Sequence, residues 1–362
     1  MKATQQLHDL GQSLWLDNIT RGMLQDGTLQ RYITELSVTG LTSNPTIFDH
    51  AIRDTPLYDA AIRDGKPGTP AEAVFVDLAL DDLTRAADLF AAVHASTAGV
   101  DGWVSMEVSP LLADDAQKTI EEAARLKARA RRDNLFIKIP GTPAGIAAIE
   151  ASIFAGVAIN VTLLFSREQY LAAANAYLRG IERRIDAGLD PNVASVASLF
   201  VSRWDVAVKD RVAPELRNKL GIAIAQRTYR AYQELLDSPR WRRLAAAGAR
   251  VQRMLWASTG SKDPEARDTL YVEALAAPGT IDTIPDKTLL AFAEHGRVGS
   301  PMAVDGGDAE QVIATMRKAG IDDAGLASQL QREGAAAFSK SWNDLMGCIA
   351  DKRRALHGVA ST

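Results

Sequence analysis

Residues 135–164 have the sequence LFIKIPGTPAGIAAIEASIFAGVAINVTLL. Its two ends, Leu135–Pro140 and Val157–Leu164, are short apolar runs rich in β-branched residues, a composition typical of buried strands. The stretch between them, Pro143–Phe154, is longer and Ala-rich, and Gly156 stands where a helix would stop. This pattern predicts a strand, a helix and a second strand parallel to the first, connected by a right-handed crossover.

The same strand–helix unit recurs along the chain. Six more apolar segments resemble strands: Ser13–Asn18, Val38–Asn44, Asp101–Val108, Ala194–Phe200, Met254–Thr259 and Thr280–Pro285. Further helix-like stretches are Ala116–Arg131, Arg167–Ala187 and Pro264–Leu275, with Ser166 and Asp263 as N-caps and Gly188 and Gly248 as stops. Eight strands that alternate with helices predict an α/β fold, the (β/α)8 TIM barrel. An open doubly wound sheet is the alternative, because strand number alone does not establish closure.

The length of 362 residues allows one large domain or two. We expect a single barrel domain over residues 1–362, in which two regions exceed the simple repeat. Residues 49–100, interrupted by GKPGTP at 65–70, predict a helical insertion between the second and third strands. Residues 297–362 predict a C-terminal helical extension whose last helix covers Ala324–His357.

The composition excludes several classes of protein. The 41 Lys and Arg against 45 Asp and Glu give a net charge of −4, so the basic surface of a nucleic-acid-binding protein is not expected. The single cysteine, Cys348, excludes an internal disulfide and a cysteine zinc site, and we expect it to pack on the C-terminal helix. The sequence has neither a signal peptide nor a long uncharged apolar run, which favours a cytoplasmic protein with no membrane partner.

Lys138 is the most informative single residue, because it stands inside the apolar run FIKIP at 136–140. Burial disfavours the charged form of a lysine, so a buried lysine supplies the neutral amine that Schiff-base chemistry needs. A lysine at a strand end can also be an ordinary side chain that reaches out to solvent. Asp17 and Glu107 end two other apolar strands, and with Lys138 they make a nucleophile and two acid–base groups.

Polar residues also end most of the other strands. Asn44, Asn160, Thr162 and Ser198 supply neutral donors and acceptors, which suit a substrate with many hydroxyl groups. Arg203 follows the sixth strand, and the loop from Ser258 to Lys262 follows the seventh, where barrels often bind phosphate. Because barrel active sites lie at the carboxyl ends of the strands, we expect these side chains to converge.

Several other kinds of site find no support in the sequence. There is no GxxxxGK[ST] phosphate loop, and Gly141 and Gly145 do not fit the GxGxxG pattern of a dinucleotide site. The five histidines are scattered without metal-ligand spacing, and no GxSxG motif of a serine hydrolase occurs. We therefore expect no metal and no cofactor.

Seven motifs in order along the chain resemble those of the transaldolases, in particular their longer bacterial form. The motifs are LWLDN at 14–18, VTGLTSNPTIF at 38–48, VSMEVSP at 104–110, FIKIPGT at 136–142, INVTLLFS at 159–166, SVASLFVSR at 195–203 and LWASTG at 255–260. The resemblance covers almost the whole chain. It implies an enzyme that moves a dihydroxyacetone unit from sedoheptulose 7-phosphate or fructose 6-phosphate to glyceraldehyde 3-phosphate or erythrose 4-phosphate.

The resemblance also implies a role for each candidate residue. Lys138 would form the Schiff base, Asp17 would take the C4 hydroxyl proton, and Glu107 would act through a water held by Thr162. Further positions match those that bind substrate: Asn44, Asn160 and Ser198 for the hydroxyls of dihydroxyacetone, and Arg203 and Ser258 for the phosphate. Shorter relatives have an arginine two positions after this serine, where the chain has Gly260, so we expect Lys262 to take its place.

Two other functions stay open at this point. A fructose 6-phosphate aldolase would share the lysine and release free dihydroxyacetone, but such relatives tend to have tyrosine where this chain has Phe200, which favours transfer. A silent barrel that serves as a scaffold is the second alternative, although such a protein would be expected to lose some inward polar residues. The sequence does not distinguish a monomer from a homodimer.

Overall fold

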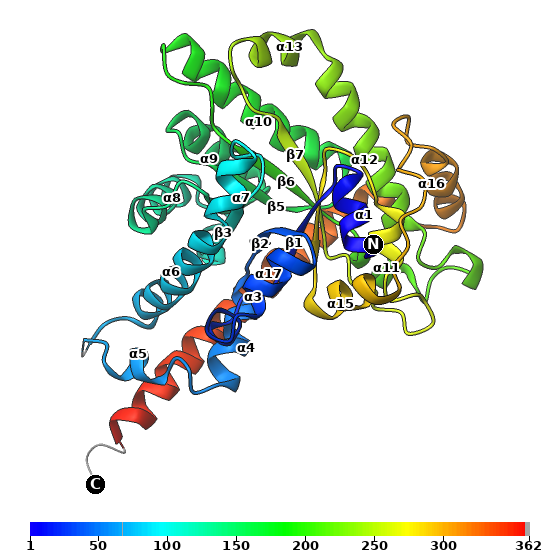
Figure 1. Cartoon of the computed structure of the whole chain (residues 1–362). Helices are drawn as coiled ribbons and strands as arrows, with labels where there is room; N and C mark the ends of the chain where they lie inside the picture. Colours follow the sequence, from blue (N-terminus) through cyan, green and yellow to red (C-terminus); the bar gives the residue numbers. More distant parts are fainter. Residues whose placement is uncertain (67, 359–362) are drawn as a thin grey trace.

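The computed structural model describes residues 1–66 and 68–358, and its centre is one closed barrel of eight parallel strands (Figure 1). The strands are β1 Ser13–Asp17, β2 Val38–Thr42, β3 Trp103–Glu107, β4 Leu135–Pro140, β5 Ile159–Leu164, β6 Ser195–Phe200, β7 Gln252–Ala257 and β8 Ile281–Ile284. Each pairs with its neighbour in chain order, and β1 pairs with both β2 and β8. The predicted TIM barrel is therefore confirmed, and the open sheet is excluded.

Helices surround the barrel and connect the strands (Figure 1). Those before β4 are α1 Ala3–Asp9, α2 Arg21–Gln25, α3 Thr28–Glu35, α4 Pro45–Asp54, α5 Asp59–Arg63, α6 Ala71–Leu89, α7 Ala91–Ser96, the 3-10 turn η1 Pro110–Leu112 and α8 Ala116–Ala130. Those after β4 are α9 Pro143–Phe154, α10 Arg167–Asp186, α11 Ser202–Val208, η2 Pro214–Leu216, α12 Leu220–Asp237, α13 Pro239–Ala246, α14 Leu270–Ala274, α15 Asp286–His295, α16 Ala309–Lys318 and α17 Asp323–Gly358.

The helix ends follow the local signals in the sequence. The Ser166 hydroxyl accepts a hydrogen bond from the Gln169 backbone N–H and caps α10, as predicted. Gly156 and Gly188 follow helices with φ of +83° and +68°, a conformation that costs glycine little. At these two glycines the helices α9 and α10 end, and the chain turns toward β5 and β6.

One helix prediction is wrong. The expected helix Pro264–Leu275, capped by Asp263, is helical only over α14, Leu270–Ala274. Asp263 does accept from the Glu265 backbone N–H at 3.0 Å, but its other oxygen accepts from Asn218 at 2.6 Å. These bonds form a turn at Asp263 and connect it to the loop that carries Asn218. Asp263 is therefore not available to cap a helix that begins at Pro264.

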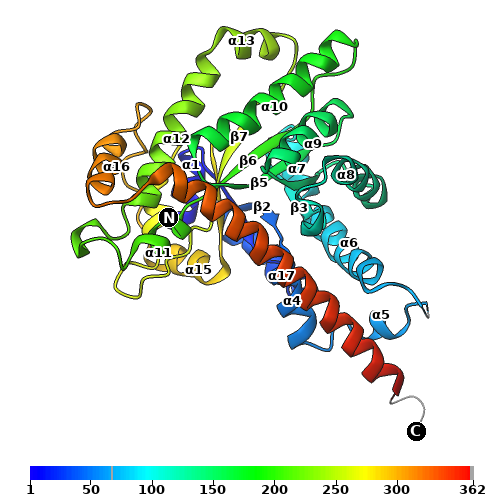
Figure 2. The same cartoon turned by 180° about the vertical axis from the view of Figure 1, so that it is seen from behind.

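The helices between β2 and β3 lie where the helical insertion was expected, although α4 already begins at Pro45. Of these, α6 packs on β3 and α8 in the position of an ordinary barrel helix. The C-terminal helix α17 packs on α4, α5, α6 and β5, so it crosses one end of the barrel (Figure 2). Cys348 is half-buried on this helix, as expected, and residues 359–362 of the expected extension lie outside the described part.

A layer of aromatic rings lies inside the barrel near the amino-terminal ends of its strands. Trp103 stacks on Phe136 with ring centroids 4.0 Å apart, and Trp15 lies 6.1 Å from Phe136. Alternate residues of a strand share a face, so polar residues further along the same strands also point inward. Asp17 stands two positions after Trp15, Lys138 two positions after Phe136, and Glu107 four positions after Trp103. The aromatic rings thus form the floor of a polar chamber.

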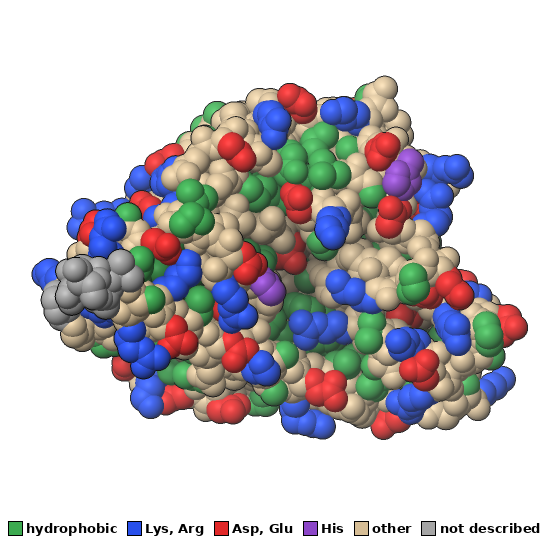
Figure 3. Space-filling view, turned by 90° about the horizontal axis from the view of Figure 1, so that it is seen from below, with side chains coloured by type: hydrophobic (Ala, Val, Ile, Leu, Met, Phe, Trp, Pro, Cys, Tyr) green, Lys and Arg blue, Asp and Glu red, His purple; other side chains and the backbone are tan. Residues whose placement is uncertain are grey.

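The outer surface carries charges of both signs side by side on the face shown in Figure 3. Within residues 1–66 and 68–358, no helix combines the length and the apolar composition that a bilayer crossing requires.

Candidate active site

A cavity of about 120 Å³ opens at the carboxyl ends of the strands, below α17. Most of the predicted site residues line it: Asp17, Asn44, Lys138, Thr162, Ser198, Phe200, Arg203, Ser258 and Lys262. Glu107 and Asn160 do not line it but contact residues that do. The structure therefore brings together all the candidate residues, which come from positions 17 to 262 of the chain.

Lys138 is buried at the base of this cavity with 5% of its surface exposed. Its Nζ donates to the Ser43 carbonyl oxygen at 3.2 Å and lies 3.2 Å from Glu107 Oε2. The register explains this pairing, because Glu107 and Asn160 are the direct partners of Lys138 on β3 and β5. An amine, a carboxyl and an amide thus lie side by side at one level of the barrel.

Glu107 is itself buried, and this burial raises the pKa of its carboxyl although the Lys138 charge opposes the shift. Apart from its ion pair with Lys138, Glu107 Oε2 has no polar partner among the described residues, and the buried Thr162 Oγ1 has no hydrogen-bond partner there. A carboxyl with a raised pKa binds a proton more tightly than a carboxyl in water, a property that suits proton exchange with a substrate.

Asp17 ends β1, and its side chain is oriented by two threonines. Thr42 Oγ1 donates to Asp17 Oδ1 at 3.0 Å and lies 3.1 Å from Thr283 Oγ1. Burial raises the pKa of Asp17, against the opposing effect of Lys138. The carboxyl therefore binds a proton more readily than one in water, a property that suits a general base. Thr42 and Thr283 were not predicted, because threonine is an ordinary strand residue.

The neutral polar residues form a second, connected group. The Ser198 hydroxyl donates to Asn160 Oδ1 at 2.7 Å, and Asn160 Nδ2 donates to Ser105 Oγ at 3.1 Å. Asn44 Oδ1 accepts from the Ile47 backbone N–H, so this residue caps α4 as well as lining the cavity. The ordinary turn role of Asn44 and its place in the site are thus both present.

Two cations lie at the upper side of the cavity. The Arg203 guanidinium lies 5.0 Å from the Phe200 ring centroid and 5.8 Å from that of Phe338. Burial lowers the pKa of Arg203, and no ion pair within 4.0 Å joins it to a carboxylate of the described residues. Lys262 Nζ lies 3.9 Å from the point where a Cβ on Gly260 would stand. Both cations are thus placed to meet an anion in the cavity.

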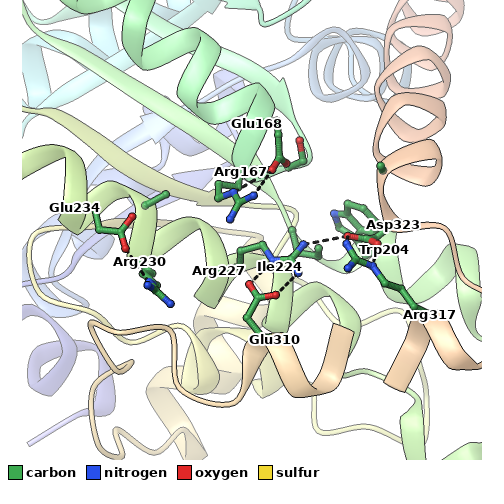
Figure 4. Close-up of a pocket in the computed structure, with 13 residues that line it drawn as sticks. Arg167, Glu168, Trp204, Ile224, Arg227, Arg230, Glu234, Glu310, Arg317 and Asp323 are labelled. Carbon is green, nitrogen blue, oxygen red and sulfur yellow. Dashed lines mark hydrogen bonds and ion pairs between the residues drawn. The ribbon is translucent and has the colours of Figure 1, made fainter. Parts of the chain in front are cut away.

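A second cavity, of about 430 Å³, lies between α10, α12, α16 and the start of α17 (Figure 4). Each of its four arginines has a carboxylate partner: Arg167 pairs with Glu168, Arg230 with Glu234, Arg317 with Asp323, and Arg227 with both Glu310 and Asp323. The arginines of this larger cavity are thus all in ion pairs, whereas Arg203 in the barrel has no carboxylate partner among the described residues.

The geometry of the barrel agrees with what the chain resembles. The family model for transaldolase/fructose-6-phosphate aldolase matches residues 14–349. A relative named transaldolase from Arthrobacter sp. (strain FB24) is 44% identical over 356 residues, 96% of each chain. A second with this name, from Thermobifida fusca (strain YX), is 43% identical over 358 residues, 96% of this chain and 97% of its own. The chain belongs to the transaldolase/fructose-6-phosphate aldolase family.

Proposed function

We propose that the protein is a transaldolase, which transfers a dihydroxyacetone unit from fructose 6-phosphate or sedoheptulose 7-phosphate to erythrose 4-phosphate or glyceraldehyde 3-phosphate. The observation that carries this proposal is the buried Lys138 amine beside the Glu107 carboxyl, 3.2 Å away, in a cavity that the cations Arg203 and Lys262 also line. A buried amine next to an acid–base group suits Schiff-base formation with a ketose, and the cations suit its phosphate.

The first half of the reaction forms the Schiff base. Lys138 Nζ adds to the C2 carbonyl of the ketose, and the carbinolamine then loses its hydroxyl as water to give an iminium ion. Glu107 supplies and recovers the protons for these steps. Glu107 Oε2, which is paired with Lys138, and Thr162 Oγ1, which has no hydrogen-bond partner among the described residues, are proposed to hold one water between them for this exchange.

The second half breaks and remakes a carbon–carbon bond. Asp17 accepts the proton of the C4 hydroxyl, the C3–C4 bond breaks, and its electron pair moves into the iminium to leave an enamine on Lys138. The first aldose departs with its new carbonyl group. The enamine then attacks the carbonyl of the second aldose, and Asp17 returns the proton to the new hydroxyl. Hydrolysis of the new iminium frees the product and the lysine.

The other candidate residues bind the substrate. We assign the hydroxyls of the dihydroxyacetone unit to Asn44, Asn160 and Ser198. The hydrogen bond from Ser198 to Asn160 orients these two residues, and the bond from the Ile47 backbone N–H orients Asn44. We assign the phosphate to Arg203 and Ser258, with Lys262 in place of the arginine that shorter relatives have at position 260. The reach of Lys262 Nζ back to Gly260 supports this replacement.

The alternative, an aldolase that releases free dihydroxyacetone, is the less favoured function. Phe200 lines the cavity where a hydroxyl from tyrosine could hold a hydrolytic water, and the two compared relatives carry the name transaldolase. We also propose that the protein acts in the cytoplasm, where the pentose phosphates are interconverted.

The proposal is tested by measuring glyceraldehyde 3-phosphate formed from fructose 6-phosphate with and without erythrose 4-phosphate. A transaldolase forms it rapidly only when the acceptor is present, and forms sedoheptulose 7-phosphate in equal amount. Equal rates with and without acceptor, together with stoichiometric free dihydroxyacetone, would overturn the transferase assignment. Lys138→Ala should be inactive, whereas Lys118→Ala, at an exposed lysine of α8, should keep full activity.

A further inference from the structure

The long helix α17 closes the chamber that holds Lys138. It crosses the barrel over the carboxyl ends of the strands, from α16 to α5 (Figure 2). Four of its residues contact the barrel or the helix α4 beside it: Gln331, Gly334, Phe338 and Ser341. Their spacing of three or four residues places them on one side of the helix. This side of α17, which we call the roof, is a wall of the site that the strand pattern does not reveal.

Hydrogen bonds hold the roof on two sides of the opening. Gln331 Nε2 donates to the carbonyl oxygens of Gly141 and Leu163, both at 3.0 Å. Gly141 directly follows β4, and Leu163 is the residue before the last of β5. At the other side, Thr46 Oγ1 donates to Ser341 Oγ at 2.8 Å. The roof is therefore fixed to the strand that carries Lys138 and to the helix that Asn44 caps.

Close packing also brings the roof near Arg203. A Cβ on Gly334 would stand 2.9 Å from Leu163 Cδ2 and 3.2 Å from Arg203 Nη1, so only glycine fits without a shift. One turn further along, the Phe338 ring is 6% exposed and lines the cavity. Its centroid lies 5.7 Å from Lys138 Nζ and 5.8 Å from the Arg203 guanidinium.

The start of α17 is anchored as firmly. Asp323, its first residue, pairs with Arg227 at 3.0 Å and with Arg317 at 2.5 Å (Figure 4). Arg227 is buried on α12 and also pairs with Glu310 of α16. Breaking one partner of a buried pair is costly, so this cluster keeps the roof in one position.

We propose that Phe338 is a specificity-determining residue, which keeps water from the enamine on Lys138 and so favours transfer of dihydroxyacetone over its release. This inference rests on the proposed transaldolase reaction. Release requires that the enamine carbon takes a proton, that water adds to C2 of the resulting iminium, and that the C2–N bond breaks. The products are dihydroxyacetone and the free lysine amine. The apolar ring near the amine keeps bulk water from the enamine carbon and so prevents the protonation that begins release, whereas the water beside Glu107 remains for hydrolysis of the product iminium.

The ring has a second effect, on Arg203. Phe200 and Phe338 both lie within 6 Å of its guanidinium, which has no carboxylate partner in the described ranges. Cation–π contact with both rings holds the guanidinium toward the cavity without neutralising it. Phe338 therefore also strengthens binding of the phosphate.

The test compares Phe338→Ala and Phe338→Leu with the unchanged protein. For each protein, two rates are measured: release of free dihydroxyacetone from fructose 6-phosphate without acceptor, and transfer of dihydroxyacetone to erythrose 4-phosphate. The readout is the ratio of the release rate to the transfer rate. The alanine variant should raise this ratio on the order of ten-fold. The leucine variant restores an apolar cover without a π face, so it should keep the ratio near the original value and raise KM for fructose 6-phosphate about ten-fold.

Leu345→Ala is the matched control, because it shortens a fully buried side chain on the same helix away from the cavity. It should lower the melting temperature and leave the ratio unchanged. An unchanged ratio in folded Phe338→Ala, or an equal rise in Leu345→Ala, would overturn the inference. If the unchanged protein transfers no dihydroxyacetone at all, the proposed function fails instead, so the two failures are distinct.

Discussion

Replacing Asp282 with asparagine should make the stability of the protein less dependent on pH. Asp282 is fully buried on β8, and burial raises the pKa of its carboxyl from 3.8 to about 7. The contacts agree with a neutral acid. Thr259 Oγ1 lies 2.8 Å from Asp282 Oδ1 and 2.9 Å from the Thr283 carbonyl oxygen. The Thr259 hydroxyl has one proton and can donate to only one of these two oxygens. If it donates to the Thr283 carbonyl oxygen and a protonated Asp282 donates to Thr259 Oγ1, both contacts are hydrogen bonds.

The sign and size of the effect follow from proton linkage. Because the folded state binds this proton more tightly than the unfolded state, the stabilisation is complete below pH 3.8 and is lost as pH rises toward 7. Each pKa unit is worth about 1.4 kcal/mol, so the carboxyl lowers the free energy of unfolding by about 3 kcal/mol between pH 5 and pH 8. Asparagine cannot ionise, so Asp282→Asn should not show this decrease in the free energy of unfolding.

The assay is urea unfolding followed by circular dichroism at pH 5 and pH 8. The unchanged protein should lose about 3 kcal/mol more than Asp282→Asn between the two conditions. The readout is the difference between the two pH values, because the amide leaves a buried N–H without an acceptor and lowers stability at both. Asp237→Asn, whose side chain is 84% exposed, should follow the unchanged protein. Parallel curves for Asp282→Asn and the unchanged protein would refute the argument.

Two further substitutions test the site. Thr42→Val removes the hydrogen bond to Asp17 and should lower kcat about ten-fold with little change in KM. Thr39→Val on the same strand should leave kcat unaltered, and equal effects of the two substitutions on kcat would contradict the positioning role of Thr42. Lys262→Ala should raise KM for the phosphorylated sugar several-fold. Lys209 lines a separate cavity next to Lys262 but does not line the barrel cavity, so Lys209→Ala should leave KM unaltered. An unchanged KM in Lys262→Ala would contradict the phosphate assignment.

The strands and their inward polar residues were predictable because they depend on short-range patterns. A buried parallel strand needs a short apolar run, and the side-chain period of two then places Lys138 on the face of Phe136. The carboxyl ends of all strands meet at one end of a barrel, so the clustering of Asp17, Glu107 and Lys138 followed from the fold.

The parts that were missed depend on contacts between distant segments. The spacing of apolar residues in α17 indicates which sides of the helix are buried, but not that one side covers the barrel with Phe338. Thr42 acts on Asp17 only because β1 and β2 pair in this register. The expected helix at Pro264 failed for the same reason, since Asn218 holds Asp263 from another loop.

The central claim is that Lys138 forms a covalent intermediate with a ketose phosphate. It is tested most directly by adding borohydride to the protein with fructose 6-phosphate and locating the reduced adduct by mass spectrometry of its peptides. The account predicts one dihydroxyacetone-derived adduct on Lys138, which is absent from Lys138→Ala and present in Lys118→Ala. An adduct on another lysine, or no adduct in an active protein, would contradict it.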